Sequence, residues 1–152
     1  RRIKHLTDAY TFPGFRPLRR VRGTFGDPVV RIVTLDVGEK SRLRDLWYSP
    51  SVLYDHRRRL VRDLSCGSFR IYLELEVRRV RCRHCGTVKQ EKLDFLADNP
   101  RYTRRFARDA GSRCRDTSIK DVARALHLDW HTTKELEKEY LREQLRRAGK
   151  PR

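Results

Sequence analysis

Apolar and polar side chains alternate along residues 69–77 more regularly than anywhere else in the chain. The apolar positions are Phe69, Ile71, Leu73, Leu75 and Val77. A period of two predicts a strand with one buried and one wet face. Leu60, Val61 and Leu64 predict a first short strand, and residues 65–68 are turn formers. Residues 57–82 are therefore predicted to form a β-hairpin.

The alternation slips at Arg78 and Arg79, because Val80 and Cys82 continue on the other parity. An extra residue in one strand produces such a slip. We therefore expect a β-bulge here that redirects the chain into the segment after Cys82.

Apolar residues in the last third recur at helical spacing. Residues 99–100 (Asn-Pro) predict the start of a first helix, which Gly111 closes. A second helix follows residues 117–118 (Thr-Ser), and a third begins at Trp130 and runs to about residue 147. The predicted inner faces hold Tyr102, Phe106 and Ala110, then Ile119, Val122, Ala123 and Leu126, then Leu136, Tyr140, Leu141 and Leu145.

The second and third helices have the organisation of a helix-turn-helix. About eight helical residues, a three-residue turn and another helix are what two small helices need to cross steeply. Ala123 is small at the expected crossing, and Thr133 takes an inward position. The first turn residue is His127 rather than the usual glycine, but histidine enters the left-handed region at modest cost.

With this register, the outer face of the third helix carries the candidate DNA-reading residues. They are Trp130, His131, Thr132, Lys134, Glu135 and Lys138. Early positions of a second helix reach base edges in the major groove. The alternative is a plain helical hairpin whose charges form a solvated face.

Residues 1–51 show little periodicity, and only residues 29–37 resemble a strand. Prolines and glycines interrupt the rest, and residues 38–54 have no clear period. We expect a basic, irregular arm with at most one hairpin, so that the N-terminal third is poorly ordered.

The net charge of +17 is spread over the whole chain and points to a long polyanion as the partner. Arginine outnumbers lysine 29 to 8, and arginine pairs bidentately with phosphates and guanine edges. No apolar run of 18 residues is present, which argues against a membrane partner. A ribosomal or RNA-packing protein remains an alternative on charge alone.

The four cysteines include one C-x-x-C-G, Cys82 to Gly86, which in zinc ribbons forms a tight knuckle. Cys66 lies at the far end of the predicted hairpin and is expected to be a small buried residue. The first strand returns toward the knuckle and makes His56 the candidate third zinc ligand. Since a full site needs four ligands, zinc binding and a metal-free remnant of a site both remain open.

Residues 55–58, 61–64 and 73–86 resemble the N-terminal zinc-binding segment of ISL-three-type insertion-sequence transposases. Residues 121–130 and 134–138 resemble the helix-turn-helix of that family, and the resemblance covers about residues 52–150. It implies binding to the terminal inverted repeats of a mobile element, next to a DDE-type catalytic domain. The family's first C-x-x-C is absent here, residues 38–53 do not resemble the family, and a frameshift or recombination would explain both.

The sequence thus predicts an α+β chain in three parts. These are a basic arm (1–51), a zinc-ribbon-like hairpin (52–97) and a three-helix helix-turn-helix domain (98–152). We expect a bacterial, cytoplasmic, nucleoid-associated protein that binds double-stranded DNA. It would bind no small-molecule substrate and would not be an enzyme by itself, because the catalytic domain would begin near residue 149. It would act as a homo-oligomer or with a separate catalytic chain. The alternative is a truncated or frameshifted transposase remnant without specific activity.

Overall fold

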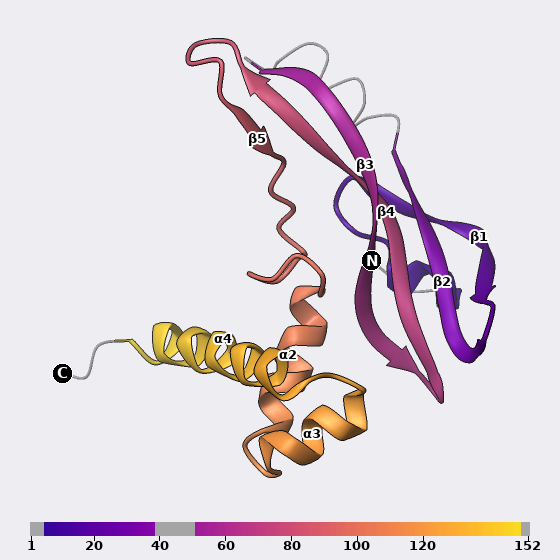
Figure 1. Cartoon of the computed structure of the whole chain (residues 1–152), viewed down its shortest axis with the longest axis vertical. Coiled ribbons are helices and arrows are strands. Elements are labelled where there is room, and N and C mark those ends of the chain that lie inside the picture. Colours follow the sequence, from indigo (N-terminus) through magenta and orange to yellow (C-terminus); the bar gives the residue numbers. More distant parts are fainter. Residues whose placement is uncertain (1–4, 39–50, 150–152) are drawn as a thin grey trace. The chain divides into compact units, whose positions relative to one another are not determined.

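The chain folds into a β-sheet unit up to Phe95 and a helical unit from Leu96, as Figure 1 shows. The structure is a computed structural model and describes residues 5–38 and 51–149, with residues 51–54 described by their backbone. The predicted α+β class is confirmed. Most of the segment without a clear period, residues 39–50, lies outside the described residues. None of the helices in the described ranges combines the length and apolarity needed to cross a bilayer.

The predicted hairpin is the centre of the sheet unit. Strand β3 (Ser51–Cys66) pairs antiparallel with β4 (Phe69–Cys82), and Gly67 turns the chain between them at φ 58°. The period-two alternation is confirmed, since β4 buries Ile71, Leu73, Leu75 and Val77. Phe69 is an exception, because at the strand end it remains 38% exposed beneath the guanidinium of Arg31.

The predicted bulge is present, but the extra residue belongs to the other strand. Leu53 pairs with Val80 and Asp55 pairs with Arg79, which leaves Tyr54 of β3 without an opposite residue. The slip in the apolar pattern of β4 therefore lies opposite an extra residue in its partner strand, β3. Two residues then face one across the ladder.

The strand predicted at residues 29–37 and the one hairpin expected in the N-terminal arm are confirmed, whereas the irregular structure expected for residues 15–24 is wrong. A 3₁₀ helix, η1 (Leu6–Tyr10), precedes β1 (Phe15–Thr24) and β2 (Asp27–Val37), which form an antiparallel hairpin. Strand β2 then pairs in parallel with β4, where Val33 stands beside Leu73. The strand order is β1-β2-β4-β3, and short β5 (Val88–Gln90) pairs with another stretch of β4.

Strand β1 escaped prediction because it is an edge strand. Only its first residue, Phe15, is buried, and exposed arginines occupy much of the remainder. An edge strand that is wet on both faces has no apolar period, and Pro17 is tolerated there because no inner ladder needs its missing N–H.

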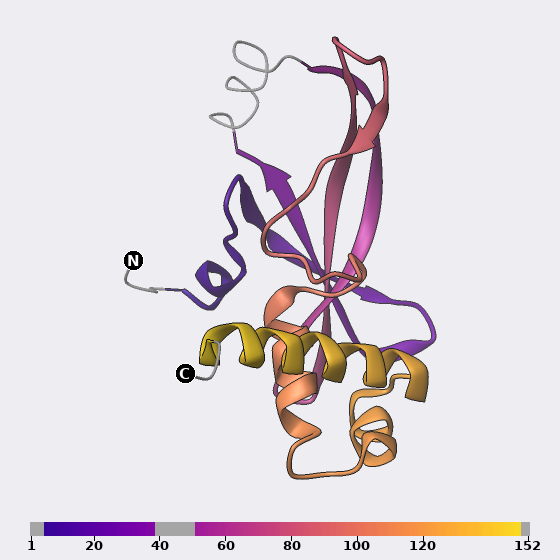
Figure 2. The same cartoon turned by 90° about the vertical axis from the view of Figure 1, so that its left-hand side faces the viewer.

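The helical unit contains α2 (Arg104–Arg113), α3 (Ile119–Leu126) and α4 (Trp130–Ala148), with α4 lying across α2 in both views (Figures 1 and 2). The predicted start at residues 99–100 is wrong. Asn99 instead accepts the N–H of Tyr102 in a turn, and the Thr103 side chain caps α2 by accepting the N–H of Phe106.

Gly111 does not close the first helix, contrary to prediction, but lies buried within it. A Cβ at this position would stand 2.3 Å from Cβ of Tyr140 in α4. Glycine is therefore needed for the close approach of α2 and α4. The inner face of α4 is also shorter than predicted, because Leu136 is buried whereas Leu141 and Leu145 are 47% and 72% exposed.

Candidate nucleic-acid interface

The turn between α3 and α4 depends on His127, which adopts the left-handed conformation at φ 52°, ψ 50°. Its N–H donates to the carbonyl of Arg124, and the N–H of Leu128 donates to that of Ala123 at 2.8 Å. These two bonds satisfy carbonyls that the end of a helix leaves unpaired, in the Schellman pattern. The three-residue turn predicted from the sequence, with histidine in place of glycine, is therefore present.

A small apolar core holds the two helices together. Val122, Ala123 and Leu126 of α3 are buried, as is Leu136 of α4. Thr133 is fully buried too, and its hydroxyl donates to the Asp129 carbonyl at 2.9 Å. The inward position predicted for this threonine is thus explained by a local bond that satisfies its hydroxyl.

The outer face of α4 carries the six predicted DNA-reading residues, and none of them is buried. Trp130 is 44% exposed, and His131, Glu135 and Lys138 are exposed. Thr132 and Lys134 are half-buried. All six lie in the first nine residues of the helix. At helical spacing, His131, Lys134, Glu135 and Lys138 lie on the side away from Thr133 and Leu136, and Trp130 and Thr132 flank that side.

Contacts within α4 orient these side chains. Lys134 Nζ lies 4.6 Å from the centre of the Trp130 ring, so that cation and indole form one unit. Lys138 donates to Glu135 at 2.7 Å, which keeps the pKa of that carboxyl below its ordinary value. Hydrogen bonds from Thr132 lower the pKa of Asp129, the N-cap residue. The side chains of Lys134 and Lys138 are therefore held by neighbours within the helix. The lowered pKa values keep Asp129 and Glu135 ionised at neutral pH.

A second basic cluster lies on the sheet unit, among the arginines of the predicted hairpin. Arg57 and Arg59 alternate along β3, and Arg79 of β4 lies in the same pocket. The sequence shows the run Arg57-Arg58-Arg59, whereas the strand pairing that sets Arg57 opposite Val77 and Asp55 opposite Arg79 brings Arg79 beside this run.

The C-x-x-C-G segment forms the expected knuckle. The N–H of Gly86 donates to the Cys82 carbonyl at 2.9 Å, and Gly86 itself has φ 67°. Cys85 Sγ lies 3.1 Å from the Thr87 hydroxyl oxygen. Hydrogen bonds from Thr87, and then from Cys82, lower the pKa of the Cys85 thiol to about 7. The knuckle thus brings together two thiols, one of which ionises readily.

The structure does not bring His56 to this knuckle. His56 pairs with Arg78, whereas Cys82 pairs with Ser51. Four residues of β4 separate Arg78 from Cys82, about 13 Å along a strand. Within residues 5–38 and 51–149, no three His, Cys, Asp or Glu side chains are grouped so that they could hold a metal ion.

The residues that the structure describes therefore do not group the four ligands that a structural zinc site takes. All four cysteines and all five histidines lie in the described ranges, so the two thiols of the knuckle account for half of such a site.

Two family models match the chain. Residues 49–85 match the zinc-finger of transposase IS204/IS1001/IS1096/IS1165, and residues 91–141 match the helix-turn-helix domain of transposase family ISL3. The second match contains α2, α3 and the first part of α4, and the first ends at Cys85.

A curated relative supports the same assignment. Over 88 residues the chain is 36% identical to the transposase for insertion sequence element IS1001 of Bordetella parapertussis. The match covers 58% of this chain and 22% of the relative, so the chain spans about a fifth of that protein. No solved structure matches the chain. In chain order, therefore, residues 49–85 and 91–141 are similar to the zinc-finger and helix-turn-helix segments of ISL3-type transposases, and the relative supports the same N-terminal region.

Proposed function

We propose that this chain recognises the terminal inverted repeats of a mobile element, and that the first half of α4 reads the DNA sequence. The observation that carries the proposal is the exposed face of six residues at the start of the second helix of a transposase helix-turn-helix. In such a motif the second helix enters the major groove, and its early residues contact base edges.

Each part of this face has a chemical role that suits DNA. Lys134 is held over Trp130 and offers donors to guanine or phosphate oxygens. His131 is exposed and can contact a base edge or a phosphate. The ion pair between Lys138 and Glu135 leaves the Glu135 carboxylate partly neutralised, which lessens its repulsion of phosphate.

The chemistry of transposition would come from outside these residues. The matched relative is a transposase, and this chain spans about a fifth of it. We propose that cutting and joining depend on a DDE-type catalytic segment, in the same protein or in a separate chain. The DNA-binding region would then act beside it on the bacterial nucleoid, as one member of a homo-oligomer.

The incomplete knuckle favours a second candidate, a transposase remnant without specific binding. Two thiols without further ligands are what loss of the family's first C-x-x-C would leave behind. In that case the chain would bind all duplexes alike, through charge.

Fluorescence-anisotropy titrations test the proposal with a duplex that carries the inverted repeat flanking the gene, and with a shuffled duplex. We expect Lys134→Ala to weaken binding to the repeat by 1–3 kcal/mol, about 5- to 150-fold, and to change binding to the shuffled duplex little. Arg146→Ala, which removes an exposed cation from the other end of α4, is the matched control.

Equal affinity of the parent for both duplexes would instead establish the remnant. A parent that prefers the repeat, with Lys134→Ala and His131→Ala both unchanged in affinity, would show that another element reads the sequence.

A further inference from the structure

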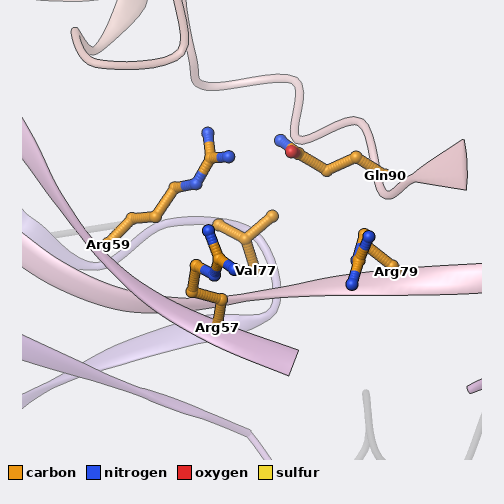
Figure 3. A pocket seen from close by; sticks show the side chains of 5 residues that line it. All are labelled: Arg57, Arg59, Val77, Arg79 and Gln90. Carbon is orange, nitrogen blue, oxygen red and sulfur yellow. The ribbon is translucent and has the colours of Figure 1, made fainter. Parts of the chain in front are cut away.

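A pocket of about 220 Å³ lies on the sheet unit and is lined by three arginines (Figure 3). Arg57 and Arg59 come from β3, Val77 and Arg79 from β4, and Gln90 from β5. A water molecule occupies about 30 Å³ of liquid, so the pocket has room for an anion the size of a phosphate group.

The strand register explains why these five side chains meet. Arg57 pairs with Val77 across β3 and β4, and Arg79 pairs with Gln90 across β4 and β5. Directly opposed residues share a face of the sheet, as do residues two apart in one strand. The buried side chain of Val77 forms the apolar floor of the pocket. In Figure 3 it lies between the two arginines of β3 and the side chains of Arg79 and Gln90.

The charges in the pocket are not balanced. Asp55 forms a two-pronged ion pair with Arg79, and that arginine holds the pKa of the carboxyl below its ordinary value. Among the described residues, Arg57 and Arg59 form no ion pair with a carboxylate, although the charge of Arg57 also helps to lower the pKa of Asp55. Arg57 is exposed and Arg59 is half-buried. With Asp55 counted, the cluster retains two positive charges.

On the opposite face of the sheet, three arginines lie near a carboxylate. Glu74 pairs with Arg22 at 2.8 Å and lies 3.8 Å from Arg58, and Asp27 pairs with Arg70. A merely solvated basic surface would give no reason for this contrast. The arginine pocket instead has the composition of an anion site, with guanidinium forks and an amide around an apolar floor.

We propose that this pocket binds a backbone phosphate of duplex DNA. Arg57 and Arg59 would donate to the phosphate oxygens, the Gln90 amide would add a donor, and Arg79 would be held in place by Asp55. The inference rests on the proposed function in that the chain binds duplex DNA. It gives the sheet unit a contact that is independent of sequence and separate from the reading helix.

The salt dependence of binding tests the proposal, because each phosphate contact contributes about −0.9 to the slope of log Kobs against log[salt]. The full chain is titrated with inverted-repeat and shuffled duplexes between 50 and 200 mM salt. We expect Arg57→Gln, and more so Arg57→Gln/Arg59→Gln, to weaken binding to both duplexes alike and to make the slope shallower by about 1. Arg58→Gln removes the same charge from the opposite face and should leave the slope within error of the parent.

A second variant avoids changes to β3. Gln90→Glu is nearly isosteric and places a carboxylate in the pocket, so it should also weaken binding and make the slope shallower. A melting temperature equal to that of the parent, measured by circular dichroism, would show that each variant is folded.

Two outcomes would overturn the proposal. In the first, the salt slopes of all pocket variants equal that of the parent, while Lys134→Ala still has lower affinity for the repeat. This outcome would leave the proposed function intact. In the second, inorganic phosphate shifts the NMR signals of Arg57 and Arg59 while the DNA slopes are unchanged, so that the pocket takes a free anion instead.

Discussion

His127 shows how a single residue fixes the geometry of the DNA-binding motif. Its left-handed backbone reverses the chain after α3 and delivers Asp129 to the N-terminus of α4. Non-glycine residues in this conformation carry a strain of roughly 1–2 kcal/mol. Among the described residues, His127 is the only one other than glycine with positive φ.

Glycine at position 127 would relieve that strain. We therefore expect His127→Gly to raise the free energy of unfolding by about 1 kcal/mol, measured by urea denaturation, with DNA affinity unchanged. Ala125→Gly, two residues earlier in α3, is the matched control and should cost about 1 kcal/mol, because glycine there loses helix propensity. A destabilised His127→Gly would mean that the imidazole makes a compensating contact.

At the scale of elements, the steep crossing of α2 and α4 depends on the absence of a side chain at Gly111. In an open helix, replacing glycine by alanine stabilises by about 1 kcal/mol. Here the new Cβ would fall 2.3 Å from Cβ of Tyr140 and 3.0 Å from the Leu136 carbonyl oxygen. Both are backbone-linked atoms, so a helix must move to make room.

We expect Gly111→Ala to destabilise the helical unit by about 1–3 kcal/mol, which a thermal melt followed by circular dichroism would measure. Its control is Arg115→Ala, an exposed substitution just after α2 that should change the melting temperature little. A more stable Gly111→Ala chain would contradict the close approach of the two helices.

The knuckle of the zinc-ribbon segment gives an element-scale prediction about metal. With two thiol ligands grouped, zinc should bind weakly and should not be coupled to folding of the β3–β4 hairpin, which is held by a long ladder and a buried apolar face. We expect a chelator, or Cys82→Ser, to leave the melting temperature of the sheet unit unchanged.

Zinc content by mass spectrometry accompanies these melts, and a Cys66→Ser chain, altered at the other end of the hairpin, serves as the control. One tightly bound zinc per chain, with a melting temperature that falls in chelator, would show that further ligands complete the site.

At the scale of the whole molecule, the distributed charge of +17 sets how binding responds to salt. If four or more phosphates are contacted, affinity for any duplex should fall about 100-fold or more between 50 and 200 mM salt. Anisotropy titrations with a shuffled duplex measure this directly. A flat response would remove the electrostatic basis for DNA binding.

The sequence predicted those parts of the molecule in which one face is buried and the other is wet. Strand β4 and helices α3 and α4 have such faces, and their residues show the matching periods. Prediction failed where tertiary contacts decide the outcome. Examples are the two-sided exposure of β1, the buried role of Gly111 and the distance of His56 from the knuckle.

The two candidate DNA contacts also differ in how far the local sequence could predict them. The face of α4 that we propose to read DNA follows from one helix and its period, so local sequence was enough to place its residues. The arginine pocket combines side chains from three strands, and the pairing of β4 with both β3 and β5 that brings them together is not visible in any one of these segments.

The parallel pairing of β2 with β4 also protects the protein from self-association. Val30–Thr34 cover the backbone of Arg70–Glu74, which would otherwise be an open strand edge able to template another chain. The new edge strand, β1, carries arginines and Pro17, which disfavour pairing with a strand of another chain. A product that starts translation after residue 38 would therefore keep its reading helix but expose a long, half-apolar edge. Such a product would tend to aggregate through β4 and would be a poor substitute for the longer chain in the cell.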